Sequence, residues 1–195
     1  YRRLKEMRKM IKKRLKTIII TSLITILPML AGLIMWQFLP EKLPTHWNFE
    51  GQIDDWSRKP FVVFGLPSIM LGIHLLCAIG TSFDPKTKNF NNKVMGLVLW
   101  ICPVLSIACM SMTYIASFGI DVRVELIIPL VVGIVLLIVG NYLSKCKQNY
   151  TIGIKIPWTL NDEENWNHTH RFAGKLWMIG GVIFALLAFA GLSST

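Results

Sequence analysis

The chain has 195 residues, of which 53% are hydrophobic and 16% are charged, and its mean hydropathy is +0.49. Soluble domains carry about 25% charged residues, so this composition excludes an ordinary soluble domain. The net charge of +10 does not indicate a nucleic-acid partner, because nine of the 21 Lys and Arg residues lie in Tyr1–Lys16. The sequence predicts an all-α fold, a polytopic helical membrane protein with no direct contact to nucleic acid.

Residues Tyr1–Lys16 are predicted to form a basic amphipathic helix. Leu4, Met7 and Leu15 recur at helical spacing, and Lys and Arg fill most other positions. Such a helix beside an apolar span is typical of binding to anionic lipid at the inner leaflet. A flexible basic tail is the alternative. Membrane lipid is therefore the first partner that the sequence predicts.

Five apolar segments follow in chain order, each long enough to cross a bilayer. They are Thr17–Phe38, Pro60–Gly80, Val94–Phe118, Glu125–Leu143 and Leu176–Leu192. Gly65 and Gly72, seven residues apart in the second segment, are expected to permit close helix packing. We expect three domains: the basic helix of residues 1–16, a two-span domain of residues 17–80, and a three-span region of residues 81–195.

The distribution of basic residues predicts the orientation in the membrane. With the N-terminus in the cytoplasm, the inner segments hold 17 of the 21 Lys and Arg residues, and the outer segments hold Lys42, Arg58, Lys59 and Arg123. Basic residues are enriched in cytoplasmic segments. The predicted location is the bacterial cell membrane, multi-pass, with a cytoplasmic N-terminus.

A polar stretch after the first span, Leu43–Trp56, is called the first motif. It combines two tryptophans with a histidine and carboxylates, and Gly51 permits a turn with positive φ. On the predicted outer face it offers contact area and polar specificity for a peptide. The candidate ligand-binding residues are His46, Trp47, Asn48, Gly51, Asp54 and Trp56.

The first motif also has a structural interpretation: a self-contained loop that bonds to its own backbone, with tryptophans as interfacial anchors. Asp54 or Asp55 is suited to cap a helix that starts near Trp56. A metal site from His46 and these carboxylates has only one histidine, so it would select poorly among transition metals. We therefore predict no metal, no cofactor and no catalytic residue.

Residues Asn149–Lys175, between the last two spans, are called the second motif, and this stretch is expected on the inner side. Glu164 and His168 share a face if the segment is helical. A structural interpretation is also open, in which Asn161 caps a helix and Glu164 completes a capping box. The candidate partner-binding or structural residues are Pro157, Trp158, Thr159, Glu164, Trp166, His168, His170, Arg171 and Gly174.

The two motifs carry a resemblance. Ile152–Leu160, Thr169–Arg171 and Gly174-Lys175, together with Leu43–Asn48 and Asp54, resemble the SdpI-like family of bacterial membrane proteins and the N-terminal domain usual in it. The resemblance implies immunity to a secreted peptide toxin of the sporulation-delaying type. It also implies capture of a cytoplasmic transcriptional autorepressor at the membrane. Six spans are common in the family, so a sixth helix is expected in the full protein.

Two other functions compete with immunity. A membrane enzyme acting on lipid or peptide would use the Glu164/His168/His170 cluster, but no nucleophile or metal set accompanies it. A small transporter would need buried charges along its path, and His74 is the one clear ionisable residue of the spans, with a bundle hydrogen bond as its expected role. The sequence favours a non-enzymatic immunity protein.

Overall fold

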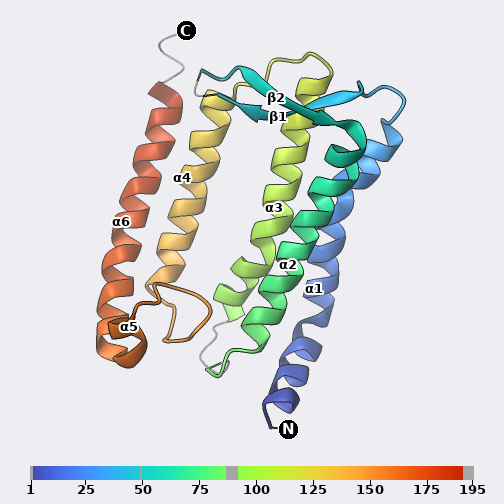
Figure 1. Cartoon of the computed structure of the whole chain (residues 1–195). Helices are drawn as coiled ribbons and strands as arrows, with labels where there is room; N and C mark the ends of the chain where they lie inside the picture. Colours follow the sequence, from blue (N-terminus) through green and yellow to red (C-terminus); the bar gives the residue numbers. More distant parts are fainter. Residues whose placement is uncertain (1, 49, 87–91, 191–195) are drawn as a thin grey trace. The chain divides into compact units, whose positions relative to one another are not determined.

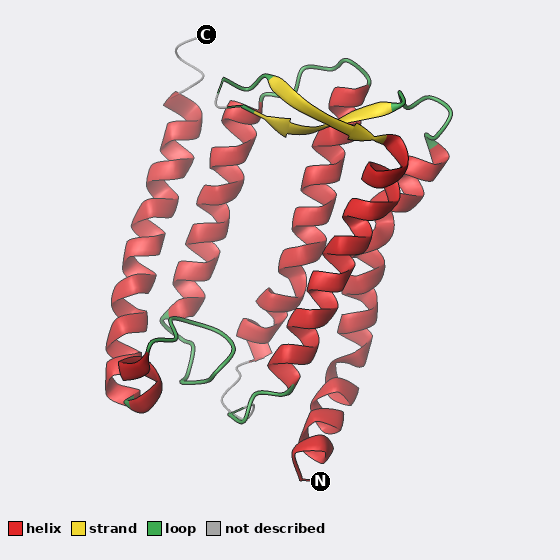
Figure 2. Ribbon diagram, viewed as in Figure 1, coloured by secondary structure: helices red, strands yellow, loops and turns green. Residues whose placement is uncertain are grey.

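A computed structural model (Figures 1 and 2) describes residues 2–48, 50–86 and 92–190. Helices account for most of these residues. In chain order the elements are α1 (Arg2–Ile34), β1 (Lys42–Trp47), β2 (Ile53–Arg58), the π-helix η1 (Phe61–Gly65), α2 (Leu66–Ser82), α3 (Asn92–Ser117), α4 (Val124–Leu143), α5 (Pro157–Asn161) and α6 (Glu163–Ala190). The two strands are an addition to the helical fold that the composition predicts.

Five helical segments in the described residues are long and apolar enough to cross a membrane. They are Ile11–Ile34, Phe61–Ser82, Lys93–Ser117, Val124–Leu143 and Glu163–Phe189. The five predicted spans and the fold class, a polytopic helical membrane protein, are thereby confirmed. α1 runs without a break from Arg2 to Ile34, so the predicted basic helix and the first span form one continuous helix.

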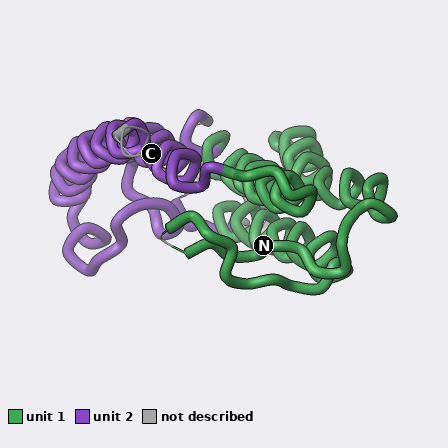
Figure 3. The backbone as a smooth tube through the Cα atoms, turned by 90° about the horizontal axis from the view of Figure 1, so that it is seen from above, with its two compact units in different colours: residues 1–82, 96–122 green, residues 83–95, 123–195 purple. Residues whose placement is uncertain are grey.

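The chain divides into two compact units (Figure 3): residues 1–82 with 96–122, and residues 83–95 with 123–195. The first unit contains α1, the β1–β2 hairpin, α2 and most of α3. The second contains α4, α5, α6 and the short segment that leads into α3. The three domains expected from the sequence stay a prediction.

Polar side chains fasten the helices of the first unit to one another. Ser106 and Tyr114 of α3 donate hydrogen bonds to the α1 carbonyls of Thr25 (2.7 Å) and Pro28 (2.9 Å). On α2, His74 is fully buried, and its Nε2 lies 3.0 Å from the Thr21 hydroxyl. His74 thus makes the bundle hydrogen bond expected of it. Such hydrogen bonds stabilise helix packing inside a membrane, where the hydrophobic effect contributes little to helix association.

In the second unit, α4 and α6 form a close antiparallel pair with glycine against glycine. A Cβ atom on Gly133 would lie 2.7 Å from the carbonyl oxygen of Gly181, and one on Gly140 would lie 2.7 Å from that of Gly174. The backbones approach closely because neither helix carries a side chain there. The expectation for Gly65 and Gly72 is wrong: a Cβ on Gly72 meets nothing within 4 Å, and Gly65 faces only Phe61.

Helix α6 begins at Glu163, one residue later than a cap at Asn161 predicts. Asp162, not Asn161, is the N-cap, because its carboxylate accepts hydrogen bonds from the backbone N–H groups of Glu164 (2.8 Å) and Asn165 (3.1 Å). Asn161 instead ends α5. From Glu163 the helix continues into the last span without interruption. A carboxylate at this position also complements the helix dipole.

Candidate recognition surfaces

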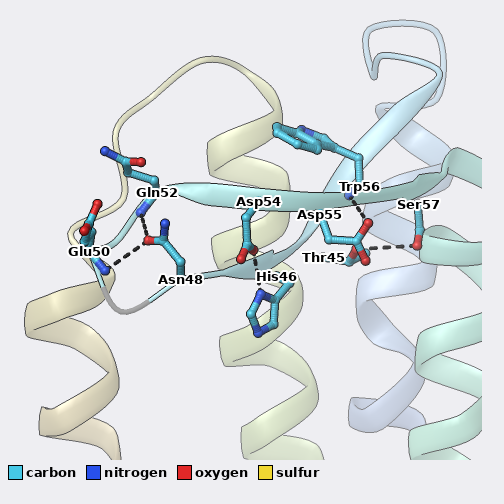
Figure 4. A network of polar contacts seen from close by, with 9 residues as sticks. All are labelled: Thr45, His46, Asn48, Glu50, Gln52, Asp54, Asp55, Trp56 and Ser57. Carbon is cyan, nitrogen blue, oxygen red and sulfur yellow. Dashed lines mark hydrogen bonds and ion pairs between the residues drawn. The ribbon is translucent and has the colours of Figure 1, made fainter.

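The first motif folds as a β-hairpin, and its turn is held by its own side chains (Figure 4). The Asn48 carboxamide oxygen accepts hydrogen bonds from the backbone N–H groups of Glu50 (3.0 Å) and Gln52 (2.9 Å). Gly51 has φ +76°, which only glycine adopts without strain. Asn48 and Gly51 therefore shape the turn. The predicted helix near Trp56 is wrong, because Trp56 lies within β2.

The hairpin displays polar and aromatic groups on its surface. His46 Nδ1 lies 2.5 Å from Asp54 Oδ1, and both side chains are largely exposed. Trp56 is 49% exposed, and its ring extends from β2 away from His46 and Asp54 (Figure 4). Trp47 is partly buried. The structure thus brings His46 and Asp54 together and leaves Trp56 open to contact.

Two buried residues fix this hairpin to the helices of its unit. Leu43 of β1 is fully buried in a cluster with Leu39, Val62, Val63, Met110 and Tyr114. The Lys59 ammonium, also buried, donates to the carbonyls of Leu39 (3.0 Å) and Trp36 (3.3 Å) past the end of α1. It lies 3.3 Å from a Glu41 carboxylate oxygen as well. The hairpin is therefore a rigid platform, and sequence reasoning missed Lys59.

The second motif is built differently, because a loop packs over the start of α6. Trp166 is fully buried and donates from Nε1 to the Cys146 carbonyl (2.7 Å). His170, also fully buried, stacks on Trp166 with ring centroids 3.9 Å apart. Gly153, at φ +118°, passes directly over both rings, and a Cβ there would collide with His170 Nε2.

Both ring nitrogens of His170 are occupied. Nε2 accepts the backbone N–H of Ile154 (3.0 Å), so the ring proton belongs on Nδ1, which donates to the Trp166 carbonyl (2.8 Å). This arrangement defines one neutral tautomer. This buried histidine connects the loop to α6 through hydrogen bonds at both ring nitrogens. Its ring therefore has no free nitrogen for catalysis or for a ligand.

Other predicted residues of the second motif are also structural. The Thr159 hydroxyl, fully buried, donates to the Ile154 carbonyl (2.7 Å) and accepts the Ile156 N–H (3.1 Å). Pro157 is the first residue of α5, a position where its missing N–H costs nothing. Gly174 provides the close contact to Gly140. The segment around Gly153 forms no strand in the described residues and packs against α6.

Several residues of the second motif are exposed. Trp158 is 60% exposed, and Arg171 is exposed on α6. Glu164 and His168 share a helix face as predicted, with 3.7 Å between His168 Nε2 and a Glu164 carboxylate oxygen. Together with Pro157, these four are the candidate residues of the motif that are exposed to a partner.

Asp84, which lies outside both motifs, organises the loop of the second unit. Its buried carboxylate accepts hydrogen bonds from the Tyr150 N–H (2.8 Å), the Thr151 hydroxyl and the Lys86 N–H (2.7 Å). The Asn149 side chain, fully buried, accepts the N–H groups of Thr151 and Ile152. The loop is therefore held from within.

The thiol of Cys146 lies under the same loop. Burial raises the pKa of Cys146, a hydrogen bond from Asn149 opposes that shift, and the Asp84 carboxylate adds to it. A thiol with a raised pKa is a poor nucleophile. All four cysteines are free. Among the described residues, no group of three or more His, Cys, Asp or Glu side chains is placed to hold a metal ion.

Comparison with known proteins agrees with both motifs. Residues 145–195 match the SdpI/YfhL protein family, and residues 23–71 match a domain of unknown function, DUF1648. The chain is 35% identical over 175 residues to "Immunity protein SdpI" of Bacillus subtilis (strain 168), covering 90% of this chain and 83% of the relative. The chain belongs to the SdpI/YfhL family. This confirms the resemblance carried by the two motifs, and no solved structure matches the chain.

Proposed function

We propose that this SdpI/YfhL family member is a membrane immunity protein, which protects its cell by binding a secreted peptide toxin at the first motif. The observation that carries the proposal is the hairpin itself. It holds the exposed groups of His46, Asp54 and Trp56 on a frame fixed by Leu43 and Lys59. A rigid surface with aromatic and charged side chains is a suitable contact site for a peptide.

Orientation supports this assignment. The 17 to 4 distribution of Lys and Arg favours a cytoplasmic N-terminus, and α1 then delivers the hairpin to the outer side, where a secreted toxin arrives. Three helical spans separate the hairpin from the loop of the second motif. That loop would therefore face the cytoplasm. Trp158, His168 and Arg171, which are exposed residues of the second motif, would there contact a transcriptional autorepressor.

The proposed role is not catalytic. An enzyme using the cluster of the second motif would need a histidine free to exchange a proton, but both nitrogens of His170 are bound to backbone groups. Glu164 and His168 are exposed and pair with each other. The cluster is thus divided between a structural histidine and a solvent-facing pair, which favours binding over chemistry.

Survival of a sensitive bacterium tests the proposal. Cells expressing this chain are challenged with a secreted peptide toxin of the sporulation-delaying type, beside cells with an empty vector. We expect protection by the wild type and loss of protection by Trp47→Ala and Asp54→Ala at equal membrane abundance. Asp121→Ala, an exposed aspartate on the same predicted side, serves as the control and should protect. Full protection by Asp54→Ala and Trp47→Ala would contradict binding at the hairpin.

A further inference from the structure

Strand β2 has an edge that no other strand covers. The sheet in the described residues consists of β1 and β2 alone. Pro44 lies opposite Trp56 and Lys42 lies opposite Arg58, whereas the Lys59 N–H donates to the Glu41 carbonyl (2.9 Å). In an antiparallel pair, bonded and non-bonded positions alternate. The backbone N–H and C=O groups of Trp56 and Arg58 therefore point away from β1.

The two edges of this hairpin are not equivalent. On β1, Pro44 has no N–H to offer, and both Pro44 and Leu43 are buried. On β2, by contrast, Asp54, Asp55, Trp56 and Arg58 are exposed. A free edge with unpaired backbone groups is a template for another strand. The β2 edge is therefore the more exposed of the two.

The β2 edge is protected by a side chain of the same strand. The outward-pointing N–H of Trp56 donates to Asp55 Oδ1 at 2.9 Å (Figure 4). This bond places the Asp55 carboxylate at the edge itself. A side-chain cap can rotate away when a carbonyl group replaces it, and a cation of the incoming segment then stabilises the released carboxylate. The cap thus blocks the edge against neutral strands and favours a basic one.

Charge points to the same occupant. From Lys42 to Arg58 the hairpin has three acids, Glu50, Asp54 and Asp55, against two bases at the strand ends, whereas the whole chain carries a net charge of +10. The half-exposed ring of Trp56 adds an apolar surface beside the edge. An extended peptide segment with a Lys or Arg next to an apolar residue complements these groups.

We propose that the toxin binds by strand addition: an extended cationic segment pairs with the β2 edge at Trp56 and Arg58. A carbonyl of the segment replaces Asp55 at the Trp56 N–H, and its cation pairs with the released carboxylate. The inference rests on the proposed function, since it specifies how the hairpin recognises its peptide. The backbone of β2 is then the principal contact with the toxin.

A matched pair of variants at Arg58 tests the role of the backbone. Arg58→Pro removes an edge N–H that β1 does not use, whereas Arg58→Ala removes only the side chain. Binding of a labelled synthetic toxin of the sporulation-delaying type is measured by fluorescence anisotropy with the full chain in detergent micelles. We expect Arg58→Ala to bind at least as tightly as wild type, because a repelling cation is gone. Arg58→Pro should bind about tenfold more weakly than Arg58→Ala, the effect of one lost hydrogen bond with its geometry.

Two further measurements guard against a misfolded proline variant. In the wild-type protein, N-methylation along the toxin backbone should weaken binding at alternate residues of one short segment, the signature of a strand. Asp55→Asn, which can still cap the edge, should weaken binding and reduce its salt dependence.

The outcomes separate the two proposals. Toxin binding with equal affinities for Arg58→Pro and Arg58→Ala, and no period of two in the N-methyl series, would overturn strand addition while leaving the immunity role in place. No toxin binding by the wild type, together with no protection of cells, would overturn both.

Discussion

Trp56 in the first motif is 49% exposed, whereas Trp166 in the second motif is fully buried. His46 lies on the surface beside Asp54, whereas His170 is bound on both ring nitrogens inside the loop. In the hairpin, asparagine and glycine build the frame and the aromatic and charged groups face outward. In the second motif, by contrast, the buried side chains of Trp166 and His170 stabilise the fold of the loop.

This difference shows that residue type alone does not decide whether a motif binds a partner or stabilises the fold. The hairpin obtains its rigidity from Leu43 and Lys59, which contact the helices of its unit, so its other side chains remain available. The loop of the second motif is held by a different set of buried groups: Ile152 and Leu160 pack against a cluster that contains Trp166. Trp166, His170 and Asp84 also bind backbone groups of the loop. Variants of the two motifs should therefore affect different properties.

The largest effect is expected for Trp166→Ala. The change empties a fully buried site and leaves the Cys146 carbonyl without its donor. Replacing a buried aromatic residue by alanine costs about 3–5 kcal/mol. We expect a low thermal midpoint in detergent and low abundance in membranes. Trp158→Ala, at a 60% exposed tryptophan of the same motif, is the control and should unfold like wild type.

His170→Ala should be the next most damaging change. It removes the ring that stacks on Trp166 and leaves the Ile154 N–H without its acceptor, and an unsatisfied buried group costs about 1–3 kcal/mol. Chemical unfolding monitored by tryptophan fluorescence measures the loss. His168→Ala, two residues away and exposed, should leave the free energy of unfolding unchanged. Equal free energies of unfolding for the two histidine variants would contradict a structural role of His170 between the loop and α6.

The glycine contacts of α4 and α6 give a third prediction. Gly140→Ala places a methyl group 2.7 Å from the Gly174 carbonyl oxygen, so the helices must separate. Overpacking of this kind costs about 1–3 kcal/mol. Gly72→Ala meets nothing within 4 Å and should be neutral or slightly stabilising, because alanine favours helix. Thermal unfolding of the two variants in the same detergent distinguishes a packing contact from helix propensity.

The smallest effect on stability is expected at the surface of the hairpin. Asp54→Asn removes the ion pair with His46, but both groups are largely exposed. Exposed pairs contribute roughly 0–1 kcal/mol. The thermal midpoint should therefore stay close to that of wild type, which is what permits a clean test of binding. A strongly lowered midpoint would show that the pair supports the hairpin and does not serve recognition.

Much of the helical fold could be predicted from sequence because membrane spans are long apolar runs, and all five were found. The hairpin was not, since Pro44 argues against a strand and the register shifts near His46 interrupt the alternation. Glycine spacing was equally ambiguous. Gly65 and Gly72 are seven residues apart, as are Gly133 and Gly140, yet only the second pair meets another helix. Whether two glycines pack closely depends on the surface of the neighbouring helix, and the spacing of the glycines carries no information about that surface.

The candidate residues show a similar limit. His46, Asp54 and Trp56 were identified by type, and the structure places them on one hairpin. The burial of Thr159, Trp166 and His170 could not be derived, because it depends on a loop that closes over α6 through Gly153 and Asn149. The groups of Tyr150 and Thr151 that Asp84 binds lie more than 60 residues after it, so no local pattern signals these contacts.

One measurement tests the contrast between the two motifs most directly: toxin survival plotted against membrane abundance for Trp56→Ala and Trp166→Ala. We predict that Trp56→Ala accumulates like wild type and fails to protect, whereas Trp166→Ala loses protection only in proportion to its lower abundance. Protection by Trp56→Ala at normal abundance, or a fully abundant Trp166→Ala that does not protect, would contradict the assignment of recognition to the hairpin and support to the second motif.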